Sequence, residues 1–155
     1  MNIRTKDNLV VIVAGIGMLL STLDTGIINV ALPFFKSYFE TTADIAAIAV
    51  TGYTISLAVF ILPFGLLSDK FGKLSFSYIG LIIFGLSSLL CGLSANVQML
   101  IMFRIFQGIG AAALQATSAS LITTLVSAEK SSSAIGVLGI MIGVGPVLGP
   151  SLGGL

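Results

Sequence analysis

Five long apolar runs dominate the pattern of hydrophobic and polar positions along the chain. They extend over residues 9–33, 45–67, 74–95, 97–126 and 134–155, with short polar segments between them. A helix needs about 20 apolar residues to cross the roughly 30 Å of hydrocarbon in a bilayer. A strand of a membrane barrel would show about 10 residues of alternating polarity, and the sequence has no such alternation. The pattern therefore predicts an all-α integral membrane protein with about five transmembrane helices.

The composition agrees with a membrane location. Hydrophobic residues make up 56% of the 155 residues, 18 more are glycine, and only 8% are charged. A typical globular chain is about 25% charged, so this chain cannot cover a water-exposed surface. The first run is too long for the core of a secretory signal, and it continues past Asp24 to Pro33 without a small-residue cleavage site. We therefore expect residues 1–155 to form one membrane-embedded unit without a linker or a second domain.

The residue types that most enzymes depend on are nearly missing. The chain has no histidine and a single cysteine. Imidazole metal sites, histidine acid–base chemistry and an internal disulfide are therefore excluded. This argues against an enzyme, and no cofactor is expected. The formal net charge of +1 gives no reason to expect a nucleic acid as partner.

The basic residues outside the runs predict the orientation. Those on the side of the N-terminus are Arg4, Lys6, Lys70, Lys73 and Lys130, whereas the other side has only Lys36. Loops rich in lysine and arginine stay in the cytoplasm. We therefore expect a multi-pass protein of the cell membrane with a cytoplasmic N-terminus.

Two ionisable residues lie well inside the runs, Asp24 in the first and Arg104 in the fourth. Such a residue costs a few kcal/mol to insert, so it faces the bundle interior and has a partner. Counting about 1.5 Å per residue places Asp24 about 13 Å and Arg104 about 10 Å below the outer surface. The matched depths predict a pair. It is either a structural ion pair or a site for protons or substrate.

Each of these two helices also has a polar face. In the fourth run one arc of about 100° contains Arg104, Gln107, Gly108, Ala111, Gln115 and Ser118. In the first run one broad side contains Gly17, Ser21, Thr22, Asp24, Thr25 and Asn29. Small residues on such a face also allow close helix packing, but packing does not easily explain the arginine and the two glutamines. The two faces predict a wet cavity between the helices.

Two glycine-containing segments have distinctive spacing. The segment GLLSDKFGK forms a predicted tight cytoplasmic turn with Gly65, Asp69, Lys70, Gly72 and Lys73, although any short loop could share this composition. In the fifth run Gly145, Gly149 and Gly153 recur every four residues and form a ridge for backbone-to-backbone packing. Pro146 and Pro150 predict a bend there. Glycine packing alone would explain this ridge.

Together these segments resemble the major facilitator superfamily, and most closely its fourteen-span multidrug:proton antiporter branch. LDTGIINVALP, residues 23–33, is similar to that branch's first-span motif, and RIFQGIGAA, residues 104–112, to the fourth-span motif. GLLSDKFGK is similar to the superfamily's loop motif, but Leu74 and Ser75 replace two basic residues. The antiporter motif of the fifth span is matched by Gly136, Gly145, Gly149, Pro150, Gly153 and Gly154.

The resemblance implies alternating access between two six-helix halves, with proton entry driving export of hydrophobic or cationic compounds. In that interpretation Asp24 exchanges a proton or faces the cation beside Arg104, and Asn29, Gln107 and Gln115 line the cavity. Asp69 latches the cytoplasmic side, and the glycine-rich helix forms the rocking interface. The expected partners are the lipid bilayer, a small-molecule substrate, protons and the missing C-terminal spans.

The chain would then be the incomplete N-terminal half of a transporter, and residues 1–155 alone would not transport. Without the remaining spans the glycine ridge of the fifth run would face lipid. Two alternatives stay open: a non-transporting membrane fragment or assembly subunit, and a major facilitator of another small solute.

Overall fold

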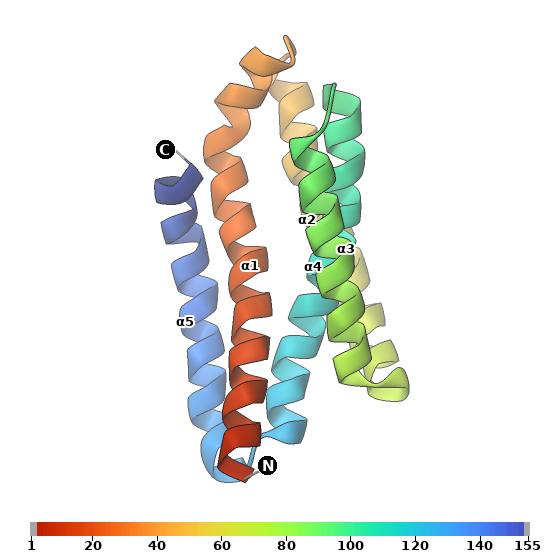
Figure 1. The fold of residues 1–155 in the computed structure, drawn as a ribbon. Coiled ribbons are helices and arrows are strands. Elements are labelled where there is room, and N and C mark those ends of the chain that lie inside the picture. The colour runs from red at the N-terminus through yellow and green to blue at the C-terminus, as the bar shows by residue number, and fades with distance from the viewer. Residues whose placement is uncertain (1–2, 154–155) are drawn as a thin grey trace.

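The computed structural model describes residues 3–153, which form a bundle of five helices in which each helix runs antiparallel to the next in the chain (Figure 1). The helices are α1 (Ile3–Tyr38), α2 (Ala43–Phe71), α3 (Lys73–Gly92), α4 (Val97–Leu125) and α5 (Ala128–Gly153). Each is long and apolar enough to cross a membrane. The all-α prediction is confirmed. Gly154 and the side chains of Arg4 and Lys6 lie outside the part that the structure describes.

The helices extend past several of the predicted span limits. α1 continues through Pro33 to Tyr38, and α5 begins at Ala128, six residues before the predicted start at 134. Helical hydrogen bonding does not stop where apolar residues do, so polar residues can form the outer turns of a membrane helix. α3 ends at Gly92, before the predicted limit at 95. Asn96 caps the start of α4 by accepting from Met99 N at 2.8 Å. The limits of the hydrocarbon within the helices stay a prediction.

The α2–α3 connection is a single residue, Gly72, with φ of +104°. Residues with a side chain rarely adopt this conformation, so glycine is required for so sharp a reversal. The backbone N–H of Gly72 donates to the Ser68 carbonyl oxygen at 3.0 Å and ends α2. The tight turn predicted at Gly72 is present.

α4 is the central helix and packs against α1, α2 and α3. Small residues let the backbones approach closely. A Cβ at Gly110 would lie 2.5 Å from Phe84 N on α3, and one at Gly108 would overlap the Tyr53 carbonyl oxygen and the Ser56 hydroxyl on α2. The interior of the bundle is therefore built around α4.

α5 packs along α1, on the side away from α3 (Figure 1). A Cβ at Gly149 would lie 2.5 Å from Gly26 Cα, and one at Gly145 would overlap the Thr22 side chain. The expectation that this glycine ridge would face lipid in the isolated chain is therefore wrong. α1 covers the ridge at Gly145 and Gly149 because it has its own small residue, Gly26, at the closest point.

Candidate functional site

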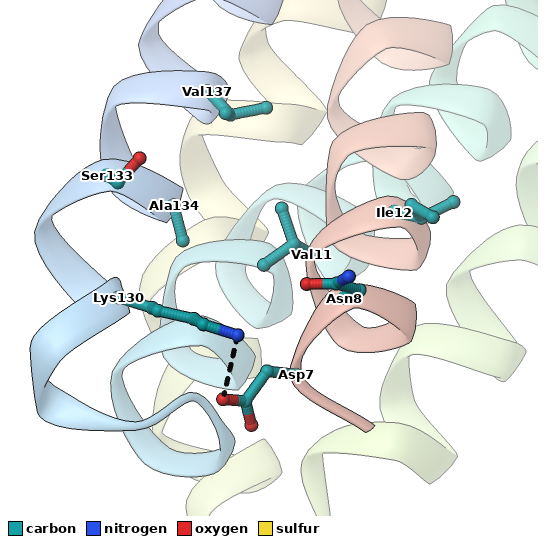
Figure 2. Close-up of a pocket in the computed structure, with 8 residues that line it drawn as sticks. All are labelled: Asp7, Asn8, Val11, Ile12, Lys130, Ser133, Ala134 and Val137. Carbon is teal, nitrogen blue, oxygen red and sulfur yellow. Dashed lines mark ion pairs between the residues drawn. The ribbon is translucent and has the colours of Figure 1, made fainter. Parts of the chain in front are cut away.

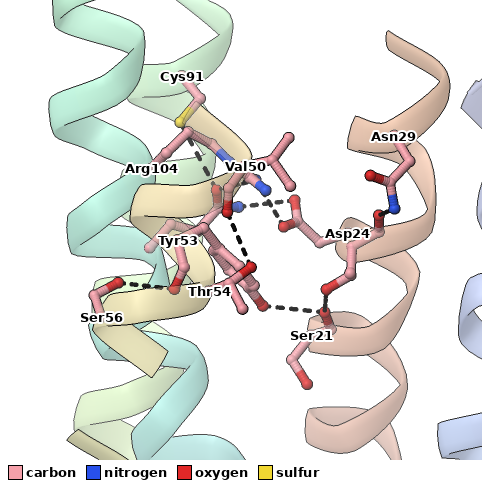
Figure 3. Close-up of polar contacts among 11 residues, drawn as sticks. Ser21, Asp24, Asn29, Val50, Tyr53, Thr54, Ser56, Cys91 and Arg104 are labelled. Atoms are coloured by element: carbon pink, nitrogen blue, oxygen red, sulfur yellow. Dashed lines mark hydrogen bonds and ion pairs between the residues drawn. The ribbon is translucent and has the colours of Figure 1, made fainter. Parts of the chain in front are cut away.

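Asp24 and Arg104 meet in the interior of the bundle, where α1 faces α4 (Figure 3). Arg104 Nη1 donates to Asp24 Oδ2 at 2.7 Å. Arg104 is 1% exposed and the Asp24 side chain 19% exposed. Opposite charges held this closely in a low-dielectric interior compensate much of each other's desolvation cost. The structure therefore brings together the two residues whose depths predicted a pair.

Gln107 completes the group, one turn along α4 from Arg104. Its Nε2 donates to Asp24 Oδ1 at 3.0 Å, and its Oε1 accepts from Arg104 Nη1 at 2.6 Å. Both carboxylate oxygens of Asp24 therefore have a donor. We call Asp24, Arg104 and Gln107 the polar triad. Asp24 remains partly exposed, whereas the two α4 residues of the polar triad are buried.

Tyr53 and Cys91 adjoin the polar triad, and the sequence analysis assigned neither of them. The Tyr53 ring on α2 lies under the guanidinium, with Arg104 Cζ 4.5 Å from the ring centroid. The Cys91 thiol on α3 donates to Gln107 Oε1 over 3.8 Å. A buried tyrosine hydroxyl usually needs a hydrogen-bond partner. Tyr53 lies inside an apolar run, so this need could have marked it as a residue of the site.

The other predicted pathway residues lie apart from the polar triad. Gln115 Nε2 donates to Ser21 Oγ at 3.2 Å, which ties α4 to α1 further along the interface. Asn29 is exposed, and its Nδ2 donates to the Thr25 carbonyl oxygen of its own helix at 3.0 Å (Figure 3). Arg104 and Gln107 are each 1% exposed, so the predicted wet cavity is not open at these two residues. Direct side-chain hydrogen bonds join the two polar faces.

The loop motif joins the α2–α3 turn to the end of α4. Lys73 Nζ lies 3.0 Å from Asp69 Oδ1, and it donates to Thr124 Oγ1 at 2.5 Å and to the Ser120 carbonyl oxygen at 3.5 Å. Ser120 Oγ also donates to Asp69 Oδ1 at 3.4 Å. A lysine near the last carbonyls of a helix is favoured by the helix dipole. Asp69 and Lys73 therefore act together at this end of the bundle.

The remaining two residues of the loop motif do not join this cluster. Lys70 Nζ lies 5.4 Å from the centroid of the adjacent Phe71 ring. Gly65 has open space where a side chain would be. Only part of the predicted motif thus makes the contacts that link α2, α3 and α4.

The antiporter motif divides into two surfaces of α5. Gly145 and Gly149 are buried against α1, where Thr22 Oγ1 also donates to the Met141 carbonyl oxygen at 3.2 Å. Gly136 and Pro150 are exposed. Gly153 ends α5, and Gly154 lies outside the described residues. One surface is therefore used within the chain, while the other is free for a further contact.

A second polar cluster lies between the first turns of α1 and α5, and the sequence did not predict it. Lys130 Nζ lies 3.9 Å from Oδ2 of the buried Asp7 (Figure 2). Ser127 Oγ donates to the same oxygen at 2.9 Å. Asp7 and Lys130 also line a pocket of about 290 Å³ with Val11 and Val137. This cluster fastens the start of α1 to the start of α5.

Comparison with known proteins gives consistent results. The chain is 36% identical over 147 residues to riboflavin transporter RibZ of Clostridioides difficile, covering 95% of this chain and 32% of that protein. It is 36% identical over 148 residues to multidrug resistance protein Stp of Mycobacterium tuberculosis, covering 95% of this chain and 28% of that protein. The chain thus spans about three tenths of the length of these curated relatives.

The fold has a counterpart among solved structures. A bacterial homologue of the human lysosomal transporter Spinster, in an inward-facing and unoccupied conformation, superposes with a TM-score of 0.82 at 21% identity. The match covers 93% of this chain and 30% of that one. The family model described as Major Facilitator Superfamily matches residues 14–155. The chain therefore belongs to the major facilitator superfamily of membrane transporters, and its five helices form the N-terminal part of that fold.

Proposed function

We propose that the protein is a proton-coupled exporter of hydrophobic or cationic compounds that works by alternating access. The observation that carries the proposal is the polar triad, in which a carboxylate inside a membrane span pairs with a fully buried arginine. Ionisable residues at such depth mark ion and substrate pathways. The similarity to multidrug resistance protein Stp supports a drug as substrate.

Asp24 is the residue that exchanges the proton in this proposal. When Asp24 takes up a proton it loses its charge, and Arg104 becomes a buried cation without a counter-ion. That state is costly, so protonation favours a different arrangement of α1 against α4. A cationic substrate would compete with the proton for the same carboxylate, which is what an antiporter requires. Gln107 holds the second oxygen of Asp24 in place, and Gln115 and Asn29 extend the pathway along α4 and α1.

The remaining motifs supply the moving parts. The Asp69–Lys73 pair latches the predicted cytoplasmic end to α4. Gly136 and Pro150, the exposed part of the antiporter motif, face the second half of the transporter. The N-terminus is cytoplasmic in the cell membrane, as the distribution of basic residues indicates.

A second candidate is a carrier of another small solute. The relative named riboflavin transporter RibZ has the same 36% identity as the multidrug resistance protein Stp. One fold can serve several substrates, because specificity depends on the site and not on the scaffold. Riboflavin is the compound to test first against the drug hypothesis.

The test uses the protein expressed from its intact gene in membrane vesicles under an imposed pH gradient. Export of a fluorescent cationic dye and of riboflavin is measured, with and without an uncoupler. We expect gradient-dependent export of the dye. Gradient-dependent movement of riboflavin alone would favour the second candidate, and movement of neither would favour a non-transporting fragment.

Asp24→Asn should reduce dye export to the uncoupled background while the protein still inserts and folds. Asparagine keeps the size of the side chain and accepts a hydrogen bond from Arg104, but it cannot carry a proton. Asp44→Asn is the matched control, because Asp44 is an exposed carboxylate in the first turn of α2. Export at the wild-type rate in Asp24→Asn would mean that the pair is only structural.

A further inference from the structure

The Arg104 guanidinium uses only part of its hydrogen-bonding capacity in the polar triad. Nη1 makes both contacts, to Asp24 Oδ2 at 2.7 Å and to Gln107 Oε1 at 2.6 Å. Nε and Nη2 are buried and have no hydrogen-bond partner among the described residues. A two-point arginine–carboxylate contact adds geometric specificity, and here the carboxylate is held through Nη1 alone. The rest of the guanidinium is therefore left for another group to hold.

The Tyr53 ring is in the position to do so. It lies 4.5 Å below Arg104 Cζ and is itself 2% exposed. Its hydroxyl donates to the Ser21 carbonyl oxygen on α1 at 3.1 Å. The ring thus has one face against the arginine of α4 and its far end bonded to the helix that carries Asp24 (Figure 3). A cation stacked on an aromatic ring away from water is held more firmly than one at the surface.

Gly108 explains how the ring reaches this place. It lies one turn after Arg104 on the same face of α4, and a Cβ there would overlap the Tyr53 carbonyl oxygen and the Ser56 hydroxyl. Ser56 Oγ donates to that same carbonyl oxygen at 2.9 Å. The absence of a side chain at Gly108 lets α2 approach α4 closely, which brings the ring beneath Arg104.

We propose that Tyr53 is a positioning residue that holds the Arg104 guanidinium in one place between α2 and α4 throughout the exchange cycle. This inference rests on the proposed function, because it assigns a part in proton exchange. When Asp24 is protonated the ion pair is lost, but the stacking on Tyr53 does not depend on the charge of Asp24. The guanidinium therefore stays in place, ready to pair again when the proton leaves.

The groups that face Asp24 come from every neighbouring helix. α4 contributes Arg104, α2 contributes Tyr53, and α3 contributes Cys91 through Gln107. α5 meets this part of α1 through Gly145, Pro146 and Gly149, which carry no titratable side chain. Arg104 is the one permanent charge in this set, so a change in its position changes how readily Asp24 exchanges a proton.

The test compares Tyr53→Leu with Tyr53→Phe in the protein from the intact gene, in vesicles with an imposed gradient. Leucine removes the ring, whereas phenylalanine keeps the ring and removes only the bond to Ser21. We expect Tyr53→Leu to slow dye export about tenfold and to move its half-maximal pH upward by about one unit. The reason is that a carboxylate whose cationic neighbour has moved away binds its proton more tightly. Tyr53→Phe should keep the pH profile of the wild type.

Tyr78→Leu is the matched control. It replaces the same side-chain type by leucine, but Tyr78 lies on α3 and is 62% exposed. Rates are divided by the amount of folded protein in the membrane. A purely structural role would lower that amount in Tyr53→Leu and leave the half-maximal pH unchanged, and this result would overturn the proposal.

A second measurement separates this inference from the proposed function. Tyr53→Leu and Arg104→Met are combined in a double-mutant cycle on thermal stability in detergent, which does not require transport. We expect the shifts in melting temperature to be non-additive. If the wild type exports nothing but the shifts in melting temperature are non-additive, the proposed function is wrong while the contact between Tyr53 and Arg104 is supported. Additive shifts would overturn the positioning role whatever the transport result.

Discussion

Two interfaces between helices, α1–α5 and α2–α4, are both built on close backbone contact at glycines and differ in what they enclose. We call these interfaces seams. Along α1 and α5, Gly26 meets Gly149 and Thr22 meets Gly145. Along α2 and α4, Gly108 lets the backbone at Tyr53 approach. Both seams bring backbones into close contact where a side chain is missing. At these glycines only the second seam encloses a charged residue, Arg104, whereas the Asp7–Lys130 pair of the first seam lies near the start of α1 and α5.

The difference separates two uses of glycine. In the α1–α5 seam the one side-chain bond across the helices that adjoins these glycines is from Thr22 to the Met141 carbonyl oxygen, so shape dominates the contact. In the α2–α4 seam the same closeness places a ring against a cation. We therefore expect the first seam to be sensitive to added volume and the second to be sensitive to lost charge.

The largest effect should come from removing charge at the α2–α4 seam. Arg104→Ala leaves Asp24 unpaired inside the bundle, which should lower the free energy of unfolding by about 3 kcal/mol or more. Asp24→Ala strands Arg104 in the same way. The double mutant should lose much less than the sum, because neither charge is left alone. Chemical or thermal unfolding in detergent measures the cycle, and additive losses would show that the two residues do not interact.

Added volume in the α1–α5 seam should have the next largest effect. Gly149→Ala would place a Cβ 2.5 Å from Gly26 Cα, so α1 and α5 must move apart. We expect a loss of about 1–3 kcal/mol in the free energy of unfolding. Gly143→Ala is the control on the same helix, since nothing lies within 4 Å of its Cβ. The control should be neutral or stabilising by up to about 1 kcal/mol. Equal melting temperatures for the two variants would contradict the packing described.

The smallest effect should come from the hydrogen bond across the α1–α5 seam. Thr22→Val keeps the shape of the side chain but removes the hydroxyl, whose one hydrogen is shared between the Met141 carbonyl oxygen at 3.2 Å and the Met18 and Leu19 carbonyl oxygens of its own helix at 3.0 and 3.1 Å. The expected cost is about 0.6 kcal/mol, typical of hydrogen bonds between membrane helices. Thr25→Val is the control, because Thr25 Oγ1 donates within its own helix to the Ser21 carbonyl oxygen. A loss above about 2 kcal/mol for Thr22→Val would mean that polarity and not shape dominates this seam.

The sequence predicted the helices and part of the site for clear physical reasons. A bilayer forces every backbone group to be satisfied within a segment, so apolar runs of sufficient length become helices. Charges in such runs must find partners, and this requirement led to Asp24 and Arg104. Gln107 followed from its angular position beside Arg104 on α4.

The missed features depend on how the helices pack against one another. Tyr53 reaches Arg104 only because α2 approaches α4 closely at Gly108, and no periodicity within α2 reveals that contact. Asn29 was grouped with Asp24 because a broad helix face does not show where the neighbouring helix lies. The ridge of α5 was expected to lack a cover because its complement, Gly26, is a single residue on a different helix.

The net charge of the polar triad has an electrical consequence. With Asp24 ionised the Asp24–Arg104 pair is neutral overall, and the membrane potential exerts no net force on it. A proton on Asp24 leaves one positive charge inside the membrane, and voltage acts on a moving charge with about 2.3 kcal/mol per 100 mV for a full crossing. A membrane that is negative inside would draw the protonated form toward the cytoplasm. The chemical and electrical parts of the proton-motive force would then act on the same two side chains.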